Sequence, residues 1–109
     1  MGIEANSGRW RNRTAQVLEF LNLWDRKHLH SGIDLPSLLR ETARKYPQMG
    51  SRDRKEWSDG VYQALRAKRY LQDESWERCL AEGLVDRYGN EHPWVIALKS
   101  NLGLADQIL

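Results

Sequence analysis

The sequence predicts an all-α fold of about five helices, and three observations lead to this prediction. Apolar residues recur at the helical spacing of about 3.6 residues in several segments, whereas no run of note alternates as a β-strand does. Residues that typically cap, open or end helices stand between those segments. The length of 109 residues fits a single domain with one core. We therefore expect one helical bundle over residues 9–109, which could itself be a fragment of a longer chain.

The first helix should run from Arg9 to about Arg26. Residues 1–8 carry little apolar content, so we expect them to be a frayed or artificially added terminus. The face of the first helix that should be buried consists of Trp10, Val17, Leu18, Phe20, Leu21 and Trp24. The following residues 27–33 (KHLHSGI) should form a loop, and its two histidines lack a nearby ligand at the spacing that a metal site needs.

A second helix is predicted over residues 35–47, because an acidic residue and two prolines stand where a helix would begin and end. Asp34 stands where an N-cap residue would stand, and Pro36 falls in the first turn, which tolerates proline. Pro47 helps to end the helix.

The central helix should begin at Ser51, which is the expected N-cap, and end near Leu71. One side of it carries an apolar stripe and the other side is basic. The apolar stripe is formed by Trp57, Val61, Ala64, Leu65 and Leu71.

Two shorter helices should follow. Asp73 or Ser75 caps the first of them, and residues 88–90 (YGN) form a turn. Pro93 opens the last helix. The five tryptophans fall at about one per helix, which predicts that they anchor the core.

The net charge of +2 is unevenly distributed. Residues 1–71 hold 14 Lys and Arg against 8 Asp and Glu, whereas residues 72–109 hold 3 against 7. A basic N-terminal portion suggests a side that faces a polyanion. The alternative is an ordinary solvated surface.

The chemistry of the chain favours binding over catalysis. The sequence has no Gly-rich phosphate loop, and the lone Cys79 falls on an apolar helical face, where a small core residue is expected. His92, before Pro93, should be a capping or surface residue. We expect no catalytic residue and no metal site. We also expect no membrane span, because no stretch of the sequence is long and apolar enough to cross a bilayer. A single cysteine and the lack of a secretory signal fit the cytoplasm.

The basic residues at the start of the first helix are candidates for nucleic-acid contact. Cations are electrostatically disfavoured at a helix N-terminus, so a cluster there suggests a function. Arginine binds phosphate, and a neighbouring tryptophan can stack on a base. The candidate residues are Arg9, Trp10, Arg11 and Arg13. The alternative is a solvated helix start with Trp10 packed on the core.

The segment RKYPQMGSRDRKEWSDGVYQALRAKRYL resembles a stretch of one family. It is similar to the NusB-like N-terminal domain of bacterial ribosomal RNA cytosine methyltransferases of the RsmB/Fmu (RsmB/NOP) type. The match rests mainly on the Gly-Ser-Arg-Asp-Arg turn at residues 50–54. The helix after the turn matches through Val61, Tyr62, Leu65, Arg66, Arg69 and Leu71. The opening helix is similar through Arg11, Arg13, Ala15, Val17 and Leu18.

The resemblance implies a NusB-like bundle that docks ribosomal RNA through basic residues, and adds Arg52 and Arg54 to the candidates. It implies an accessory role beside a separate C-terminal methyltransferase domain, which would hold S-adenosylmethionine and the catalytic cysteines. No cofactor is therefore expected in this chain. Asp53 could instead have a structural role, by pairing with Arg52, Arg54 or a basic residue of another helix.

Three other functional hypotheses stay open. A free-standing NusB-like antitermination factor would bind RNA together with a ribosomal protein. A helical protein-interaction module would use its basic face for an acidic partner, or its Ile108–Leu109 tail to dock on a following domain. A small enzyme would need a titrating histidine or cysteine in a deep cleft.

Overall fold

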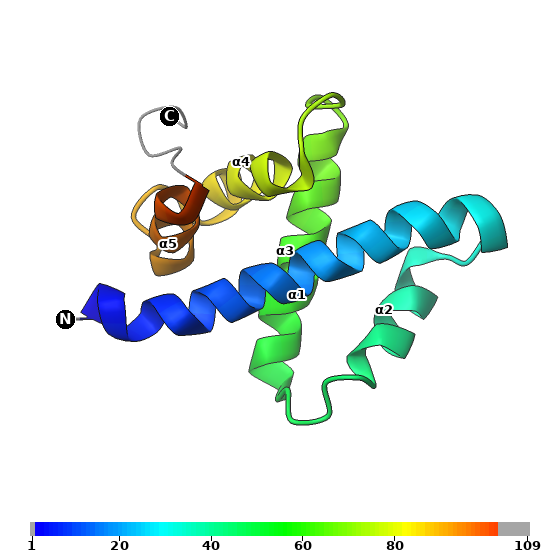
Figure 1. Ribbon diagram of the computed structural model, residues 1–109, viewed down its shortest axis with the longest axis horizontal. Coiled ribbons are helices and arrows are strands. Elements are labelled where there is room, and N and C mark those ends of the chain that lie inside the picture. The colour runs from blue at the N-terminus through cyan, green and yellow to red at the C-terminus, as the bar shows by residue number, and fades with distance from the viewer. Residues whose placement is uncertain (1, 103–109) are drawn as a thin grey trace.

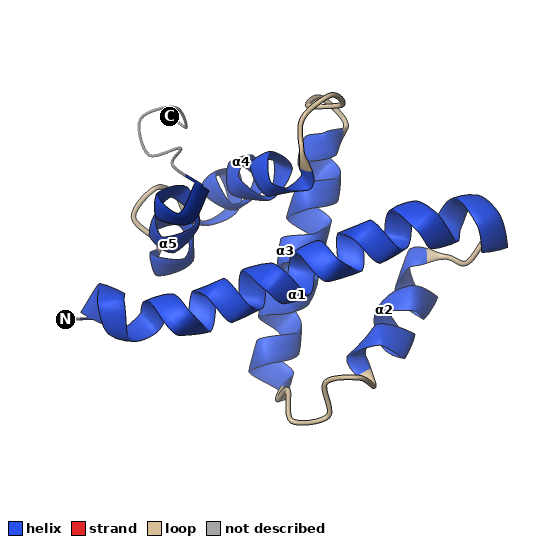
Figure 2. Ribbon diagram, in the orientation of Figure 1, coloured by secondary structure: helices blue, strands red, loops and turns tan. Residues whose placement is uncertain are grey.

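The protein is an all-α bundle, and its described part contains five helices and no strand (Figures 1 and 2). The computed structural model describes residues 2–102, and the side chains of residues 8–100. The predicted Ile108–Leu109 contact therefore lies outside the described residues. The helices are α1 (Gly2–Ser31), α2 (Leu35–Ala43), α3 (Ser51–Lys68), α4 (Trp76–Tyr88) and α5 (Pro93–Leu102). None of these helices has the length and apolar character needed to cross a membrane.

Helix α1 is longer at both ends than the sequence predicts. It begins at Gly2 and continues to Ser31, so the loop predicted for residues 27–33 is wrong except for its last two residues. Side chains in the last turns bond back to the helix: His28 Nδ1 lies 2.6 Å from the Trp24 carbonyl oxygen, and the Ser31 hydroxyl donates to the Lys27 carbonyl oxygen at 2.7 Å. Gly32, with a φ of 66°, then ends the helix in the left-handed conformation that glycine favours.

Most of the predicted helix starts are confirmed, whereas α2 ends at Ala43, before the predicted end at Pro47, and α3 ends at Lys68, before Leu71. Asp34 Oδ1 accepts from the Ser37 N–H at 2.8 Å and caps α2, and the Ser75 hydroxyl caps α4 by accepting from the Arg78 N–H. Gly89, with a φ of 86°, ends α4 at the predicted turn. The N-cap of α3, in contrast, is Gly50 rather than Ser51, and no side chain caps this helix.

Helix α1 crosses α3 and contacts every other helix (Figure 1). Helix α5 packs on the first half of α1, and α2 lies beside its second half, whereas α4 packs along α3. The result is a flattened body of 42 × 34 × 18 Å.

The core forms where α1, α3, α4 and α5 meet, and it confirms the predicted role of most of the tryptophans. Trp10, Trp57, Trp76 and Trp94 are buried, while Trp24 is only partly buried. Indole N–H groups link distant elements: Trp94 Nε1 donates to Thr14 Oγ1 at 2.9 Å, and Trp76 Nε1 donates to Asp25 Oδ2 at 2.6 Å. Cys79 is buried in the same core, and burial raises the pKa of its thiol.

Candidate nucleic-acid interface

The arginines predicted at the start of the first helix lie about two turns inside α1. Because the helix begins at Gly2, the cluster of Arg9, Arg11 and Arg13 is not at the positive end of the helix dipole. The helix dipole therefore does not disfavour these arginines, and the prediction of unfavourable charges at the helix start is wrong. What places Arg9 and Arg13 is the point at which α1 passes the first turns of α3.

Arg13 is buried in an ion-pair network between α1 and α3. Only 6% of the residue is exposed. Its Nη2 lies 2.9 Å from Asp53 Oδ1, and its Nη1 donates to Gln16 Oε1 at 2.7 Å. Its Nε is 3.6 Å from Glu56 Oε1, which is an ion-pair distance but too long for a good hydrogen bond. Arg13 is thus a link between helices, and Asp53 has the structural partner on another helix that the sequence left open.

Arg9 extends the same network outward. Its Nη2 donates to both oxygens of Glu56 at 2.9 Å. The side chain of Arg9 is 39% exposed, so one edge of this guanidinium faces solvent. We call Arg9, Arg13, Asp53 and Glu56 the α1–α3 ion network.

Trp10 lies in the core and offers no free ring face. It is 5% exposed, and its ring stacks on Trp94 with a centroid distance of 5.6 Å and an interplanar angle of 17°. His92 approaches the same ring edge-on at 5.6 Å, and the Arg9 guanidinium lies over it at 4.3 Å. The predicted stacking of Trp10 on a base is therefore wrong for this structure. The ring packs in the core instead, as the alternative prediction has it.

Besides Arg9, the exposed candidate arginines are Arg11, Arg52 and Arg54. None of these last three forms an ion pair or a side-chain hydrogen bond with any residue in the described part of the chain. Arg52 and Arg54 flank Asp53 in the first turn of α3. Arg11 points away from Arg13, because residues two apart on a helix lie on different faces. The six candidates therefore do not form one continuous surface.

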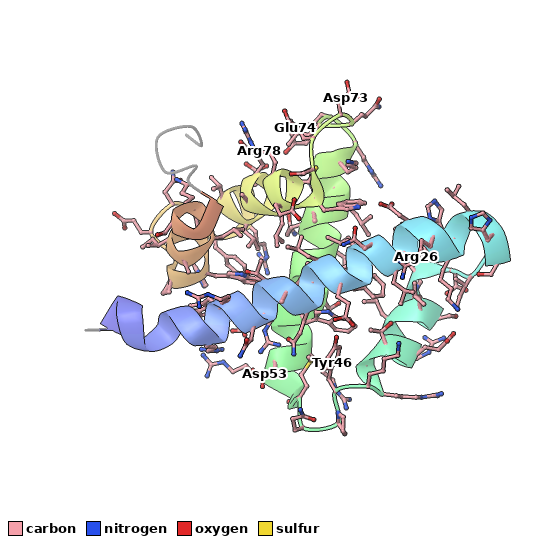
Figure 3. The ribbon with its side chains drawn as sticks, in the orientation of Figure 1. Arg26, Tyr46, Asp53, Asp73, Glu74 and Arg78 are labelled. Atoms are coloured by element: carbon pink, nitrogen blue, oxygen red, sulfur yellow. The ribbon has the colours of Figure 1, made fainter. Side chains whose placement is uncertain are left out.

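A polar groove of about 390 Å³ opens beside the network, between α1, the link before α3 and the first turn of α3. Figure 3 shows Asp53 at the lower end of α3 with Tyr46 near it. The Tyr46 hydroxyl donates to Glu19 Oε1 at 3.1 Å, and burial together with this carboxylate raises the pKa of Tyr46. The groove is lined by Arg9, Asn12, Arg13, Gln16, Tyr46, Gln48, Met49 and Asp53.

The first turn of α3 borders this groove and has free backbone donors. The first N–H groups of a helix have no intrahelical acceptor, and Gly50 supplies no side chain to cap them. The first backbone hydrogen bond of α3 is donated by the Arg54 N–H and accepted by the Gly50 carbonyl oxygen. The N–H groups of residues 51–53 therefore point out of the helix beside Arg52 and Arg54, and such an end suits an anion.

Sequence reasoning missed Glu56, Gln16 and the amide side chains of the groove. The signal for Glu56 was its spacing of three residues from Asp53, which places both carboxylates on one helical face, opposite two arginines spaced by four. The structure brings these two pairs together.

In the described part of the chain, no group of three or more His, Cys, Asp or Glu side chains could hold a metal ion. His92 is in the predicted capping role: its Nδ1 accepts from the Trp94 N–H at 3.1 Å, at the start of α5. Burial lowers the pKa of His92, as does Arg9, whereas Glu56 opposes this shift.

Comparison with protein-family models, with curated proteins and with solved structures found no match. The NusB-like resemblance therefore continues to rest on the residues and motifs that carry it.

Proposed function

We propose that this chain is an RNA-docking helical domain that serves as the N-terminal accessory part of an S-adenosylmethionine-dependent ribosomal RNA cytosine-5 methyltransferase. One observation carries the proposal: the first turn of α3 combines free backbone N–H groups with two exposed, unpaired arginines, Arg52 and Arg54. This turn is the same Gly-Ser-Arg-Asp-Arg segment on which the family resemblance rests. The all-α fold is compatible with it.

The mechanism would be neutralisation of backbone phosphates. A phosphate at the start of α3 would accept from the free N–H groups of residues 51–53, while Arg52 and Arg54 supply opposite charge. Such contacts orient an RNA without reading its bases. Arg11 would supply a separate phosphate contact from α1.

The α1–α3 ion network would act as a positioning element. Arg13 ties Asp53 to α1 at 2.9 Å and so fixes the direction in which the first turn of α3 faces. The Nη2 group of Arg9 donates to Glu56. The exposed part of the Arg9 side chain would reach a second phosphate. S-adenosylmethionine and the reacting cysteines would belong to a separate domain, and this chain would only bind and orient RNA.

The test is the affinity for a short ribosomal RNA hairpin, measured by fluorescence anisotropy at several salt concentrations. We expect the affinity of the wild-type chain to fall steeply with salt, because counterions are released from the RNA. The double variant Arg52→Ala/Arg54→Ala should bind more weakly, and its salt slope should be smaller by about 2, at about one unit per lost phosphate contact.

The matched control is Arg66→Ala/Arg69→Ala, which removes two exposed arginines from the other end of the same helix. The control should keep the wild-type salt slope. Equal losses in both double variants would mean that the RNA responds only to overall charge. That result, or no binding at low salt, would contradict the proposed interface.

A further inference from the structure

The far half of α3 presents a second kind of surface, which the RNA-docking function does not use. Leu65 and Arg66 follow Tyr62 by three and four residues, and Arg69, the C-cap of α3, follows them by four and three, so these residues lie close together beside the buried stripe. Tyr62 is 45% exposed. This face of α3 is therefore not fully covered by the other helices.

Two grooves lie along this face and join. The first, of about 400 Å³, lies between the start of α2 and α3 and contains Leu35 and Tyr62. The second, of about 280 Å³, lies between α1, α3 and the start of α4 and contains Trp24 and Trp76. Leu65 and Arg69 line both grooves, so the two form one continuous surface. We call it the α3 double groove.

The charge of the double groove is positive. Arg66, Lys68 and Arg69 line it, and neither arginine forms an ion pair with any residue among 8–100. Its single carboxylate, Asp25, accepts the Trp76 indole N–H at 2.6 Å. The acidic residues Asp73 and Glu74 lie in the loop beyond the end of α3 (Figure 3), outside the residues that line either groove.

The two tryptophans of the double groove are poorly arranged for stacking on bases. Trp24 is already stacked on His28 at 4.6 Å with an interplanar angle of 13°. Lys68 Nζ lies over the Trp76 ring at 4.9 Å. Tyr62 is exposed and offers one ring, whereas a single strand stacks successive bases on several rings. The aliphatic side chains that line the grooves suit the side chains of a protein better than the faces of nucleobases.

We propose that the α3 double groove is a docking surface for an acidic segment of another protein that carries bulky apolar side chains. Leucine or aromatic side chains of the partner would enter the two grooves. Amphipathic helices bind other hydrophobic grooves through apolar side chains in the same way. Carboxylates beside the anchors would pair with Arg66 and Arg69, whose charges have no partner in the described chain. This pairing would select an acidic partner over a neutral or basic one.

The test begins with a displayed library of random peptides of about 14 residues, a length of about four helical turns. The library is panned on the whole chain and counter-selected on the variant Arg66→Glu/Arg69→Glu. We expect the enriched peptides to be acidic and to share large apolar residues three or four positions apart. Enrichment of basic or neutral peptides, or no enrichment, would overturn the proposal.

The enriched peptide is then measured by fluorescence anisotropy against matched variants. Arg66→Glu/Arg69→Glu should lower its affinity by at least about tenfold, as loss of paired interfacial charges does. Arg52→Glu/Arg54→Glu reverses two charges at the other end of α3 and should change it by less than about twofold. Tyr62→Ser, at an exposed position, should weaken binding, and its circular dichroism spectrum should match that of the wild type.

Three other results would overturn the proposal. One is a peptide affinity that responds equally to both charge reversals. Another is self-association of the chain in sedimentation experiments that Arg66→Glu/Arg69→Glu abolishes, because a second copy would then cover the groove. The third is single-stranded RNA that competes with the peptide and depends on Tyr62. Failure of hairpin binding through Arg52 and Arg54 would leave this proposal standing, since it concerns the opposite end of α3.

Discussion

Helix α3 contacts its neighbours in two different ways along its length. At its first turns, charged side chains reach across to α1, and Arg13 and Arg9 bind Asp53 and Glu56. Farther along, the backbone itself approaches α4: a Cβ atom at Gly83 would lie 2.7 Å from the Gln63 carbonyl carbon. The first contact can adjust by rotation of long side chains and by hydration. The second cannot adjust without separating two helices.

The largest effect should follow from Gly83→Ala. The added methyl group would meet the backbone of α3, so α3 and α4 must move apart. We expect the free energy of unfolding to fall by about 2–3 kcal/mol, even though alanine favours a helix over glycine by about 1 kcal/mol. Urea unfolding would measure the change.

The control is Gly8→Ala, where nothing lies within 4 Å of the added Cβ. This variant should be as stable as the wild type or more stable by about 0.5–1 kcal/mol. If Gly83→Ala behaved like Gly8→Ala, α3 and α4 would not be in direct backbone contact, and the contrast between the two ends of α3 would disappear.

A smaller effect should follow from Arg13→Met, which fills the same space without the charge. The change leaves Asp53 and Glu56 without their buried partner. Because the Asp53 side chain is 40% exposed and stays hydrated, we expect a loss of only about 1–2 kcal/mol. Thermal unfolding at low and high salt would measure it.

Arg9→Ala is the comparison variant for Arg13→Met, since it removes the exposed member of the same network. Exposed ion pairs contribute up to about 1 kcal/mol and weaken in salt. The cost of Arg9→Ala should therefore shrink at high salt to the part that comes from packing on Trp10, whereas that of Arg13→Met should persist in full. Equal costs with equal salt dependence would mean that burial does not distinguish the two arginines.

The smallest effect concerns pH and His92, which lies between the ion network and α5. Its Nδ1 accepts a hydrogen bond from the Trp94 N–H, so the cap requires the neutral ring. Because the pKa of folded His92 is lowered, mainly by burial, the unfolded chain binds this proton more readily. Stability should therefore fall as pH drops below about 6.5, the ordinary histidine value, until the folded pKa is also passed.

The measurement is the change in melting temperature between about pH 7.5 and about pH 5.5, in wild type and in His92→Asn. Asparagine is a good N-cap but does not titrate, so the variant should lose less stability on acidification. An equal loss in both proteins would show that other groups cause it.

The elements of this fold could be predicted from the sequence because their signals are local. The caps Asp34 and Ser75 and the turn at Gly89 act through neighbouring residues, and the structure confirms each of them. The end of α1 at Ser31 was missed, although Gly32 is the usual signal for a helix end, because the His28 and Ser31 side chains extend a segment that lacks apolar periodicity.

The candidate site could be predicted only in part, because its assembly depends on how two helices cross. The sequence shows that Arg9 and Arg13 share a face of α1, and that Asp53 and Glu56 share a face of α3. It does not show that the two faces meet. Arg13 and Trp10 were therefore predicted to be available to RNA, whereas the contact of α1 with α3 buries Arg13 and the ring of Trp94 in α5 covers Trp10.

The contact between α1 and α5 has a consequence for the order in which the chain folds on the ribosome. Trp94 donates to Thr14 across 80 residues of sequence, and its ring covers Trp10. At about 5–20 residues per second, translation needs roughly 4–16 s to make the intervening chain. During this time the Trp10 ring lacks the Trp94 ring that covers it in the folded chain. A nascent chain of this kind exposes an apolar surface to chaperones and to aggregation until α5 emerges.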